Sequence, residues 1–312
     1  MQTMLGYACL NAELREKKIY TNRTLRMATL VAKGYEKVAE LVIQNLTDLI
    51  TILEWNEANN IRFYRLSSEV FPFMSHPEHG YHIKDLPQAE IILDLLQKAG
   101  DYATINGHRI TTHPGPFNVL CSPHENVVSK TILDLEAHAE IFDAMGFHPS
   151  HYNKINIHLG GAYGEKDSAM DRFVQNIDLL SDSVLRRLTI ENDDRANLFS
   201  VFDLYHGVYI KTGIPIVFDY HHHKFNTGGM SEEEAAKLAY STWPTKPVFH
   251  YSESKTLEQG QEKETPAHSD YIYQYIDNYD LDIDIMIEAK MKEQALFRYA
   301  KEQKSLIGVK QS

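Results

Sequence analysis

The sequence has few of the features that mark secreted or membrane proteins. It contains only two cysteines, Cys9 and Cys121, in 312 residues, which is too few for a disulfide framework. Its longest apolar runs are far shorter than the roughly 18 residues that a membrane span needs. The first residues, MQTMLGYACLN, lack the basic start and cleavage site of a signal peptide. We therefore expect a cytoplasmic protein with reduced, largely buried thiols and no membrane partner.

Positive charge is also scarce. The chain has 31 Lys and Arg against 43 Asp and Glu, a net charge of -12. Because proteins that coat nucleic acids usually have a basic surface, this balance counts against a generic polyanion binder. The rest of the composition, 43% apolar and 24% charged, excludes long disorder and collagen-like repeats. The length allows two domains or one α/β barrel with insertions.

Strand-like runs alternate with helical segments along the chain. The predicted strands cover residues 4–10, 61–68, 108–114, 153–160, 188–193, 215–221, 246–252 and 284–290. Predicted helices are two segments within 25–60, then 85–100, 122–145, 168–187, 197–212, 231–243 and 266–278, with Ser122 and Ser231 as helix starts. This alternation predicts the α/β class, as a single (β/α)8 TIM barrel domain over residues 1–312. A doubly wound open sheet is the alternative, but no GxGxxG follows the first strand.

The chain is rich in histidine, and several of its 16 histidines end predicted strands. The imidazoles and carboxylates at strand ends are His113, His158, Glu191, Asp219, His222, His250 and Glu288. One histidine beside a strand is usually a core or surface residue, but six consecutive strands share this pattern at the face where barrel active sites lie. Several carboxylates buried together without cations would repel one another. The pattern therefore favours a polynuclear metal site, with a metal-free acid–base site as the alternative.

The types of side chain also narrow the choice of metal. Imidazole and carboxylate without thiolate suit Mn²⁺ or Zn²⁺, and Mg²⁺ less well. Asp219 and His222 are three residues apart, so we expect the strand to end near Tyr220 and a turn to bring His222 inward, with His221 and His223 facing elsewhere. His268 and Asp270 follow the seventh strand and could reach back to the site, and His76 in the second βα loop is a weaker candidate for holding a ligand in place.

Clusters of two or three divalent ions are suited to phosphodiester hydrolysis, because one ion activates water while another stabilises the leaving oxygen. The residues therefore indicate a barrel hydrolase acting on phosphate esters. A metal-dependent sugar isomerase stays open at this point, because such barrels also hold His and Glu ligands at strand ends.

Nine segments, in order over almost the whole chain, resemble the ultraviolet damage endonucleases, which are barrel relatives of the endonuclease IV family. They are LGYACLNAEL, NLTDLITILEWNEANNIRFYRLSSEVFP, TTHPG, NIHLGGAYGEK, LTIENDD, FDYHHH, FHYSES, AHSDYI and MIEAKMKEQAL. The resemblance implies a DNA repair enzyme that flips bases and cuts the backbone immediately 5′ of cyclobutane pyrimidine dimers and 6-4 photoproducts. It also implies about three divalent ions, usually manganese, and double-stranded DNA as partner; we expect a monomer.

The resemblance also implies residue roles. The implied metal ligands are His113, His158, Glu191, Asp219, His222, His250, His268 and Glu288, of which Glu191, His250 and Glu288 are the expected catalytic residues. Tyr7 and Asn11 match positions near the scissile strand and the lesion. Without the resemblance, a core aromatic residue and a turn residue explain them equally well.

Two positions depart from the family pattern. After HPG, relatives usually carry glutamine and an aromatic residue that wedge into the duplex; here Pro116 and Phe117 follow, so only the apolar wedge is kept. Relatives also tend to have lysine two residues before the histidine of the seventh strand, where this chain has Val248. Lys246 lies too low in the strand to substitute, and Lys154 is predicted at the opposite end of the barrel from the site.

The remaining basic residues gather near the first βα loop: Arg15, Lys17, Lys18, Arg23 and Arg26. A role on the DNA backbone and a merely solvated surface are equally good explanations. Two other functions stay open beside lesion cleavage. One is an abasic-site endonuclease, favoured if HPGPFN no longer admits two flipped bases, and the other is a non-catalytic lesion-binding protein.

Overall fold

The computed structural model describes residues 3–260 and 263–309. In this part of the chain eight parallel strands form one sheet in the order β6-β5-β4-β3-β2-β1-β8-β7. The strands are β1 (Leu5–Ala8), β2 (Phe63–Leu66), β3 (Arg109–Thr112), β4 (Ile155–His158), β5 (Leu188–Glu191), β6 (Ile216–Val217), β7 (Val248–Tyr251) and β8 (Asp284–Ile287). A bridge between Asp219 and His250 joins the two edge strands, so the barrel is nearly closed. The predicted α/β barrel and its eight strands are confirmed.

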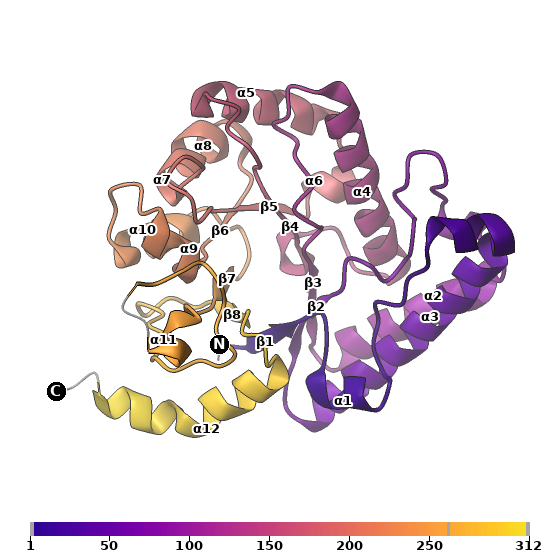
Figure 1. The fold of residues 1–312 in the computed structure, drawn as a ribbon, viewed down its shortest axis with the longest axis horizontal. Helices are drawn as coiled ribbons and strands as arrows, with labels where there is room; N and C mark the ends of the chain where they lie inside the picture. The colour runs from indigo at the N-terminus through magenta and orange to yellow at the C-terminus, as the bar shows by residue number, and fades with distance from the viewer. Residues whose placement is uncertain (1–2, 261–262, 310–312) are drawn as a thin grey trace.

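Helices surround the strands on all sides (Figure 1). They are α1 (Ala12–Glu16), α2 (Met27–Ala58), α3 (Ala89–Ile105), α4 (Glu125–Ala144), α5 (Lys166–Asn176), α6 (Asp182–Leu185), α7 (Val201–Leu204), α8 (Ile210–Thr212), α9 (Tyr220–Phe225), α10 (Glu232–Tyr240), α11 (Thr256–Gln259) and α12 (Glu293–Val309), with short turns η1 (Ile83–Asp85), η2 (His151–Asn153), η3 (Ile177–Leu179) and η4 (Tyr205–Tyr209). Gly34, at φ +66°, divides α2 into the two predicted segments. Among the described residues, no helix combines the length and the apolar character needed to cross a membrane.

Of the two serines predicted to begin helices, one does so and the other does not. Ser231 caps α10 as predicted: its hydroxyl accepts from the backbone N–H of Glu234, whose carboxylate accepts from the N–H of Ser231. The prediction at Ser122 is wrong, because α4 begins only at Glu125. The Ser122 hydroxyl accepts instead from the N–H of His124, in a turn that precedes the helix.

The segment 266–278 is not the predicted helix. Two carboxylates that precede the segment accept from its backbone N–H groups: Glu253, after β7, accepts from Tyr273 and Gln274, and Glu258, in α11, accepts from Asp270. These tertiary bonds replace helical ones. The terminal helix α12, by contrast, was not predicted.

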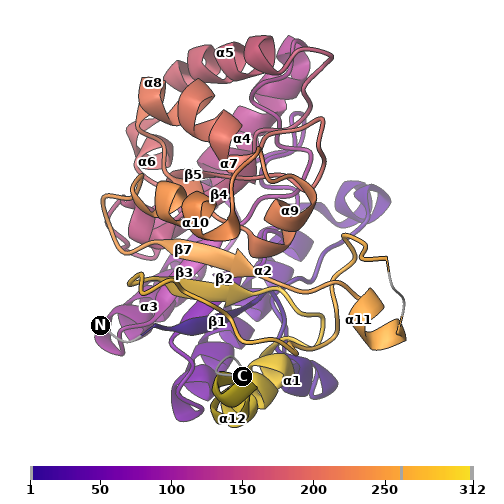
Figure 2. The same ribbon diagram turned by 90° about the vertical axis from the view of Figure 1, so that its left-hand side faces the viewer.

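Inside the barrel, polar and apolar layers alternate. Ala8, Phe63, Val248 and Met286 form an apolar cluster of their own, distinct from the main core between strands and helices. At the amino ends of the strands, the buried guanidinium of Arg109 donates to Asp284 at 2.9 Å, and Lys246 lies 3.0 Å from the same carboxylate group. Lys246 is therefore engaged at that end, as its low position predicts. Figure 2 shows the opposite end, where α11 lies on the side to which β7 points.

Candidate metal centre

The carboxyl ends of the strands bring the predicted ligands together. Three groups have one ligand atom per residue, all within 4.8 Å of one another: His113, His158 and Glu191; Glu191, Asp219 and His222; and Asp219, His250 and Glu288. Because Glu191 and Asp219 are shared, the groups form one continuous cluster. His268 is outside these groups, but its ring lies against Glu288, with Nδ1 3.1 Å from the Glu288 carbonyl oxygen.

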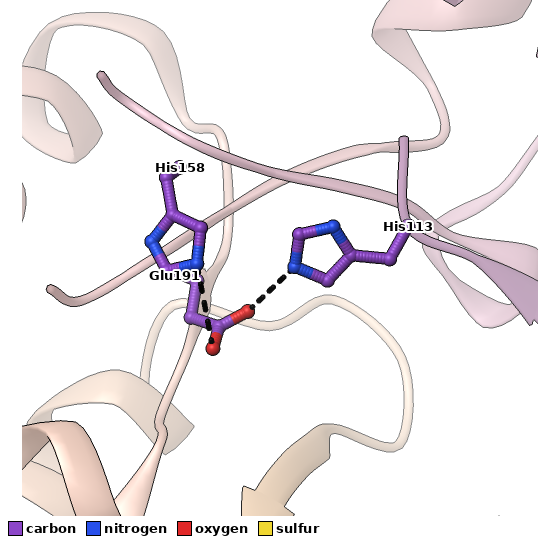
Figure 3. A group of neighbouring side chains, drawn as sticks. All are labelled: His113, His158 and Glu191. Carbon is purple, nitrogen blue, oxygen red and sulfur yellow. Dashed lines mark hydrogen bonds and ion pairs between the residues drawn. The ribbon is translucent and has the colours of Figure 1, made fainter. Parts of the chain in front are cut away.

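Glu191 lies at the centre of the cluster and is only 1% exposed. Its Oε2 is 3.2 Å from His113 Nε2 and 3.1 Å from His250 Nδ1. Its Oε1 is 3.4 Å from His222 Nδ1 and 3.9 Å from His158 Nε2. Figure 3 shows the carboxylate facing the rings of His113 and His158. A carboxylate with imidazoles on both oxygens is well placed to bridge two ions.

Most of the imidazoles are held from behind by an oxygen atom. The Nδ1 partners are the carbonyls of Pro114 for His113, Asn192 for His222 and Glu288 for His268, and the carboxylate of Asp193 for His158, all at 2.9 to 3.1 Å. Such a partner fixes the ring, and in His113 and His158 it leaves Nε2 facing Glu191, which is the usual arrangement behind metal-bound histidine.

The turn after β6 places Asp219 and His222 on the same cluster. Asp219 caps α9, and its Oδ1 accepts from the backbone N–H of His222 at 2.8 Å. The other oxygen, Oδ2, is buried and accepts no hydrogen bond among the described residues. A buried carboxylate oxygen without a donor fits a cation ligand. His221 and His223 turn toward Phe225 and Phe218 instead, in agreement with the expectation that they face elsewhere.

The electrostatics of the cluster are those of a site built for cations. Burial acts to raise the pKa of Glu191, but the imidazoles around it outweigh burial and hold that pKa well below its usual range. Burial opposes the charged form of His158, yet Glu191 and Asp193 raise its pKa to about 10. Burial raises the pKa of Asp219 to about 6 and lowers that of His250 to about 4. Without metal, protonated imidazole therefore balances part of the carboxylate charge.

Three residues that sequence reasoning missed support the cluster from inside the barrel. The Arg65 guanidinium forms a buried ion pair with Glu288, and the Asn156 amide donates to Glu191. Both residues lie on the inner faces of their strands, so strict alternation along β2 and β4 could have found them.

The third residue is Lys154, whose side chain extends farther than predicted. Its backbone does precede β4 at the amino end, but its fully buried side chain brings Nζ to 3.2 Å from His250 Nε2. Burial lowers the pKa of the Lys154 amine well below its usual value. Strand position predicts where the backbone lies, and a four-carbon side chain extends beyond that position.

Tyr7 and Asn11, expected near the lesion, are fully buried. The Tyr7 hydroxyl donates to Asn56 at 2.6 Å and accepts from the Asn11 amide at 3.0 Å. The Asn11 Oδ1 accepts from the N–H of Leu14 and caps α1. These contacts favour the alternative explanation, a core aromatic residue and a turn residue.

The HPGPFN segment lies at the surface of the carboxyl end. Phe117 is 89% exposed and, with Pro116, lines a cavity of about 670 Å³ whose other wall includes Phe71 and Pro72 after β2. An exposed aromatic ring on a loop is available for stacking on a base.

The two residues predicted to support the ligands, His76 and Asp270, have partners outside the cluster. His76 Nδ1 accepts from the N–H groups of Glu78 and His79, so it organises its own turn. Asp270 is 3.5 Å from Lys255 Nζ. Neither residue belongs to the three ligand groups found among the described residues.

Within the basic group, Arg23 has a structural role, because it pairs with Asp48 at 2.7 Å and donates to backbone carbonyls. Arg15, Lys17, Lys18 and Arg26 are exposed. Lys17 pairs with Glu13 at 2.8 Å, and Arg15, Lys18 and Arg26 remain available for contacts with a phosphate backbone.

Comparison with known proteins gives a consistent result. The profile of the family described as UV-endonuclease UvdE matches residues 3–312. The UV-damage endonuclease of Schizosaccharomyces pombe is 39% identical over 306 residues, covering 94% of this chain and 49% of that protein. The chain thus spans about half the length of this relative. The UV DNA damage endonuclease of Bacillus cereus (strain G9842) is 35% identical over 286 residues, covering 88% of this chain and 86% of that protein.

Solved structures show the same barrel. The crystal structure of SacUVDE superposes with a TM-score of 0.84 at 33% identity, covering 98% of this chain and 99% of that one. A xylose isomerase domain protein from Planctomyces limnophilus has a TM-score of 0.53 at 12% identity, covering 81% and 90% of the two chains, which shows a shared fold alone.

Proposed function

Because the chain belongs to the UV-endonuclease UvdE family, we propose that it is a DNA repair endonuclease that hydrolyses the phosphodiester immediately 5′ of a UV photolesion. The observation that carries this proposal is the continuous cluster from His113 to Glu288 at the carboxyl end of the barrel. Its substrate would be double-stranded DNA containing pyrimidine dimers or 6-4 photoproducts. We further propose that residues 1–312 form one domain that acts as a monomer on DNA in the cytoplasm.

We propose that the cluster holds about three divalent ions, with Mn²⁺ favoured over Zn²⁺ and Mg²⁺. The ligands would be His113, His158, Glu191, Asp219, His222, His250, His268 and Glu288. The unpaired Asp219 Oδ2 and the oxygen partners behind four imidazoles support this donor set. When bound, such ions polarise the phosphate and make water a better nucleophile.

The protein's own groups would hold this centre rigid. Glu191, fixed by the Asn156 amide, would contact the reacting atoms together with His250 and Glu288, and the Arg65 guanidinium keeps the Glu288 carboxylate in place. Ligands held by neighbours within a rigid barrel need little rearrangement when the substrate binds. This positioning accounts for the buried polar contacts around the cluster.

DNA binding would come from the surrounding loops. The exposed Phe117 ring would stack in the gap left by flipped bases, and Pro116 beside it stiffens the loop without adding a hydrogen bond. Exposed Arg15, Lys18 and Arg26 would contact phosphates. Since the chain is acidic overall, we expect weak and strongly salt-dependent binding to undamaged DNA.

A nicking assay tests the proposed function. Labelled duplexes bearing one cyclobutane dimer, one abasic site or no damage are incubated with the protein in Mn²⁺ and in EDTA. The proposal predicts a metal-dependent cut immediately 5′ of the dimer. Cutting at the abasic site alone would identify an abasic-site endonuclease, which is the second candidate because Pro116 alters the wedge. Binding without cutting would identify a lesion-binding protein.

A further inference from the structure

Tyr163 is an exposed aromatic residue with a strained backbone at the carboxyl end of the barrel. Its φ is +50° and that of Gly164 is +89°, and the N–H of Glu165 donates to the carbonyl of Ala162 at 3.0 Å. Positive φ at both central positions is the pattern of a type I′ turn, which favours asparagine or glycine there. A tyrosine in this position costs conformational energy, and such strain is concentrated where a side chain serves function.

The Tyr163 ring is held in place by three neighbours. The Arg172 guanidinium lies 5.7 Å from the ring centroid and is itself fixed, because its Nε donates to the Cys121 carbonyl at 2.8 Å. The His124 ring meets Tyr163 edge-on, with centroids 6.4 Å apart, and a Cβ at Gly161 would lie 3.3 Å from the Tyr163 ring. Tyr163 is nevertheless 48% exposed. A ring that is fixed by its neighbours and still open to solvent is preorganised to stack on a flat ligand.

The turn 162–165 lies beside the metal centre and beside the loop that carries Phe117. It follows His158, whose ring centroid is 5.6 Å from that of His113, the residue at the start of the Phe117 loop. The two loops pack together, because a Cβ at Gly160 would lie 2.4 Å from the Val119 side chain. Two exposed aromatic rings therefore follow the paired strands β3 and β4 at the same end of the barrel.

The charges around the Tyr163 ring favour a base over a phosphate as its ligand. Glu165 and Asp167 are exposed beside the turn and would repel a phosphate group. The Arg172 Nη2 is buried, so a phosphate would not reach it. A nucleobase is neutral and flat, and stacking on an aromatic side chain does not depend on its sequence.

We propose that Tyr163 is a second stacking residue for damaged DNA, whose ring packs on a base that has left the helix when the lesion is extruded. The inference rests on the proposed function and adds a binding residue to it. Bases in an intact duplex are stacked on both faces, so this contact forms only with opened DNA. Tyr163 and Phe117 would hold the opened duplex at two points beside the metal centre.

Binding to two duplexes tests the inference. Fluorescence anisotropy, with the full chain and with Ca²⁺ in place of Mn²⁺, measures affinity for a duplex bearing one cyclobutane dimer and for the undamaged duplex. We expect Tyr163→Asn to weaken binding of the dimer duplex about 5- to 150-fold, the range of one base–aromatic stack, and to leave affinity for the undamaged duplex unchanged. Because asparagine tolerates positive φ, the midpoint of thermal unfolding should equal or exceed that of the wild type.

Two further variants serve as controls. Tyr163→Phe keeps the ring without the hydroxyl and is expected to bind the dimer duplex as the wild type does. Leu179→Asn replaces a 59% exposed side chain in η3, beyond the other end of α5, and is expected to bind both duplexes normally. If Tyr163→Asn does not fold, Tyr163→Gly takes its place, with the same loss expected, because glycine also adopts positive φ.

Several results would overturn the inference. Wild-type affinity of the folded Tyr163 variant for the dimer duplex would do so. An equal loss for both duplexes would do so as well, because it indicates a contact with the DNA backbone, as would the same loss in Tyr163→Phe or in Leu179→Asn. Failure of the proposed function gives a different result: the wild-type protein would prefer the dimer duplex but leave it uncut in Mn²⁺, while Tyr163→Asn would still lose that preference.

Discussion

The two ends of the barrel treat buried charge in opposite ways. At the amino end, Arg109 and Asp284 are both fully buried and paired, and the guanidinium also donates to the Tyr152 carbonyl at 2.8 Å. At the carboxyl end, Glu191, Asp219 and Glu288 gather around one cluster, and one Asp219 oxygen has no donor among the described residues. The matched charges at the amino end suit a structural role, and the Asp219 oxygen without a donor at the carboxyl end is available to a cation.

This contrast separates stability from function within one barrel. A change at the amino end should alter the free energy of unfolding and leave the chemistry intact. A change at the carboxyl end should alter metal binding or cleavage with a small effect on folding.

The largest expected effect is the loss of cleavage in Glu191→Gln. The amide is isosteric but cannot supply the charge that the central carboxylate provides to the ions, so nicking should fall to the level of the EDTA control. Circular dichroism should show an unchanged fold. Glu233→Gln, at a carboxylate on α10 paired with Lys237, is the matched control and should cleave normally. Wild-type nicking by Glu191→Gln would remove Glu191 from the site.

A substitution at the amino end should lower the free energy of unfolding. Asp284→Asn leaves the buried Arg109 charge without its partner, and breaking a buried pair in this way costs about 3–5 kcal/mol. Urea denaturation of the metal-free protein measures the loss. Asp219→Asn, the same substitution at the other end, should leave that free energy unchanged or raise it, because it removes a carboxylate oxygen that has no donor. An equal loss of unfolding free energy in Asp284→Asn and Asp219→Asn would contradict the distinction between the two ends of the barrel.

Phe117→Ala should weaken lesion binding without affecting the fold. An aromatic ring stacked on a base contributes about 1–3 kcal/mol, so we expect affinity for a dimer duplex to fall roughly 5- to 150-fold. Ile105→Ala is the control, because this side chain is 81% exposed and ends α3 just before the amino end of β3. Fluorescence anisotropy measures the affinity of both variants, with Ca²⁺ in place of Mn²⁺ so that the duplex is not cleaved. An effect of equal size in the two variants would show that Phe117 makes no specific contact.

The last expected effect concerns pH. Because the pKa of His158 is raised to about 10, its ring is protonated at pH 7 to 9 in the metal-free protein and must lose that proton to bind an ion. Mn²⁺ affinity should therefore rise about tenfold per pH unit over this range. Calorimetry in buffers of different ionisation enthalpy should detect one proton released, and His158→Gln should abolish that release. A pH-independent affinity would contradict this assignment.

The sequence was most informative where a pattern repeats. Six of the eight strands are short apolar runs that end in a ligand-type residue, so both the fold and the gathering of residues such as His113 and Glu191 followed from strand order. The turn that carries His222 was also predictable, because a spacing of three cannot keep two side chains on one face of a strand.

Contacts between distant segments were not predictable. The segment 266–278 has helix-forming residues, but the carboxylates of Glu253 and of Glu258 in α11 accept hydrogen bonds from its N–H groups. Lys154 does precede β4 as expected, but the reach of its side chain to His250 was not foreseen. Tyr7 and Asn11 were expected at the lesion, and their mutual hydrogen bond in the core was not visible in the sequence.

The metal centre is tested most directly by anomalous diffraction from crystals soaked in Mn²⁺. We predict manganese peaks between Glu191, Asp219 and Glu288 at the carboxyl ends of the strands, within reach of the surrounding imidazoles. Peaks confined to the outer surface, or a cluster without manganese at saturating concentration, would contradict the assignment of this end of the barrel as a metal centre.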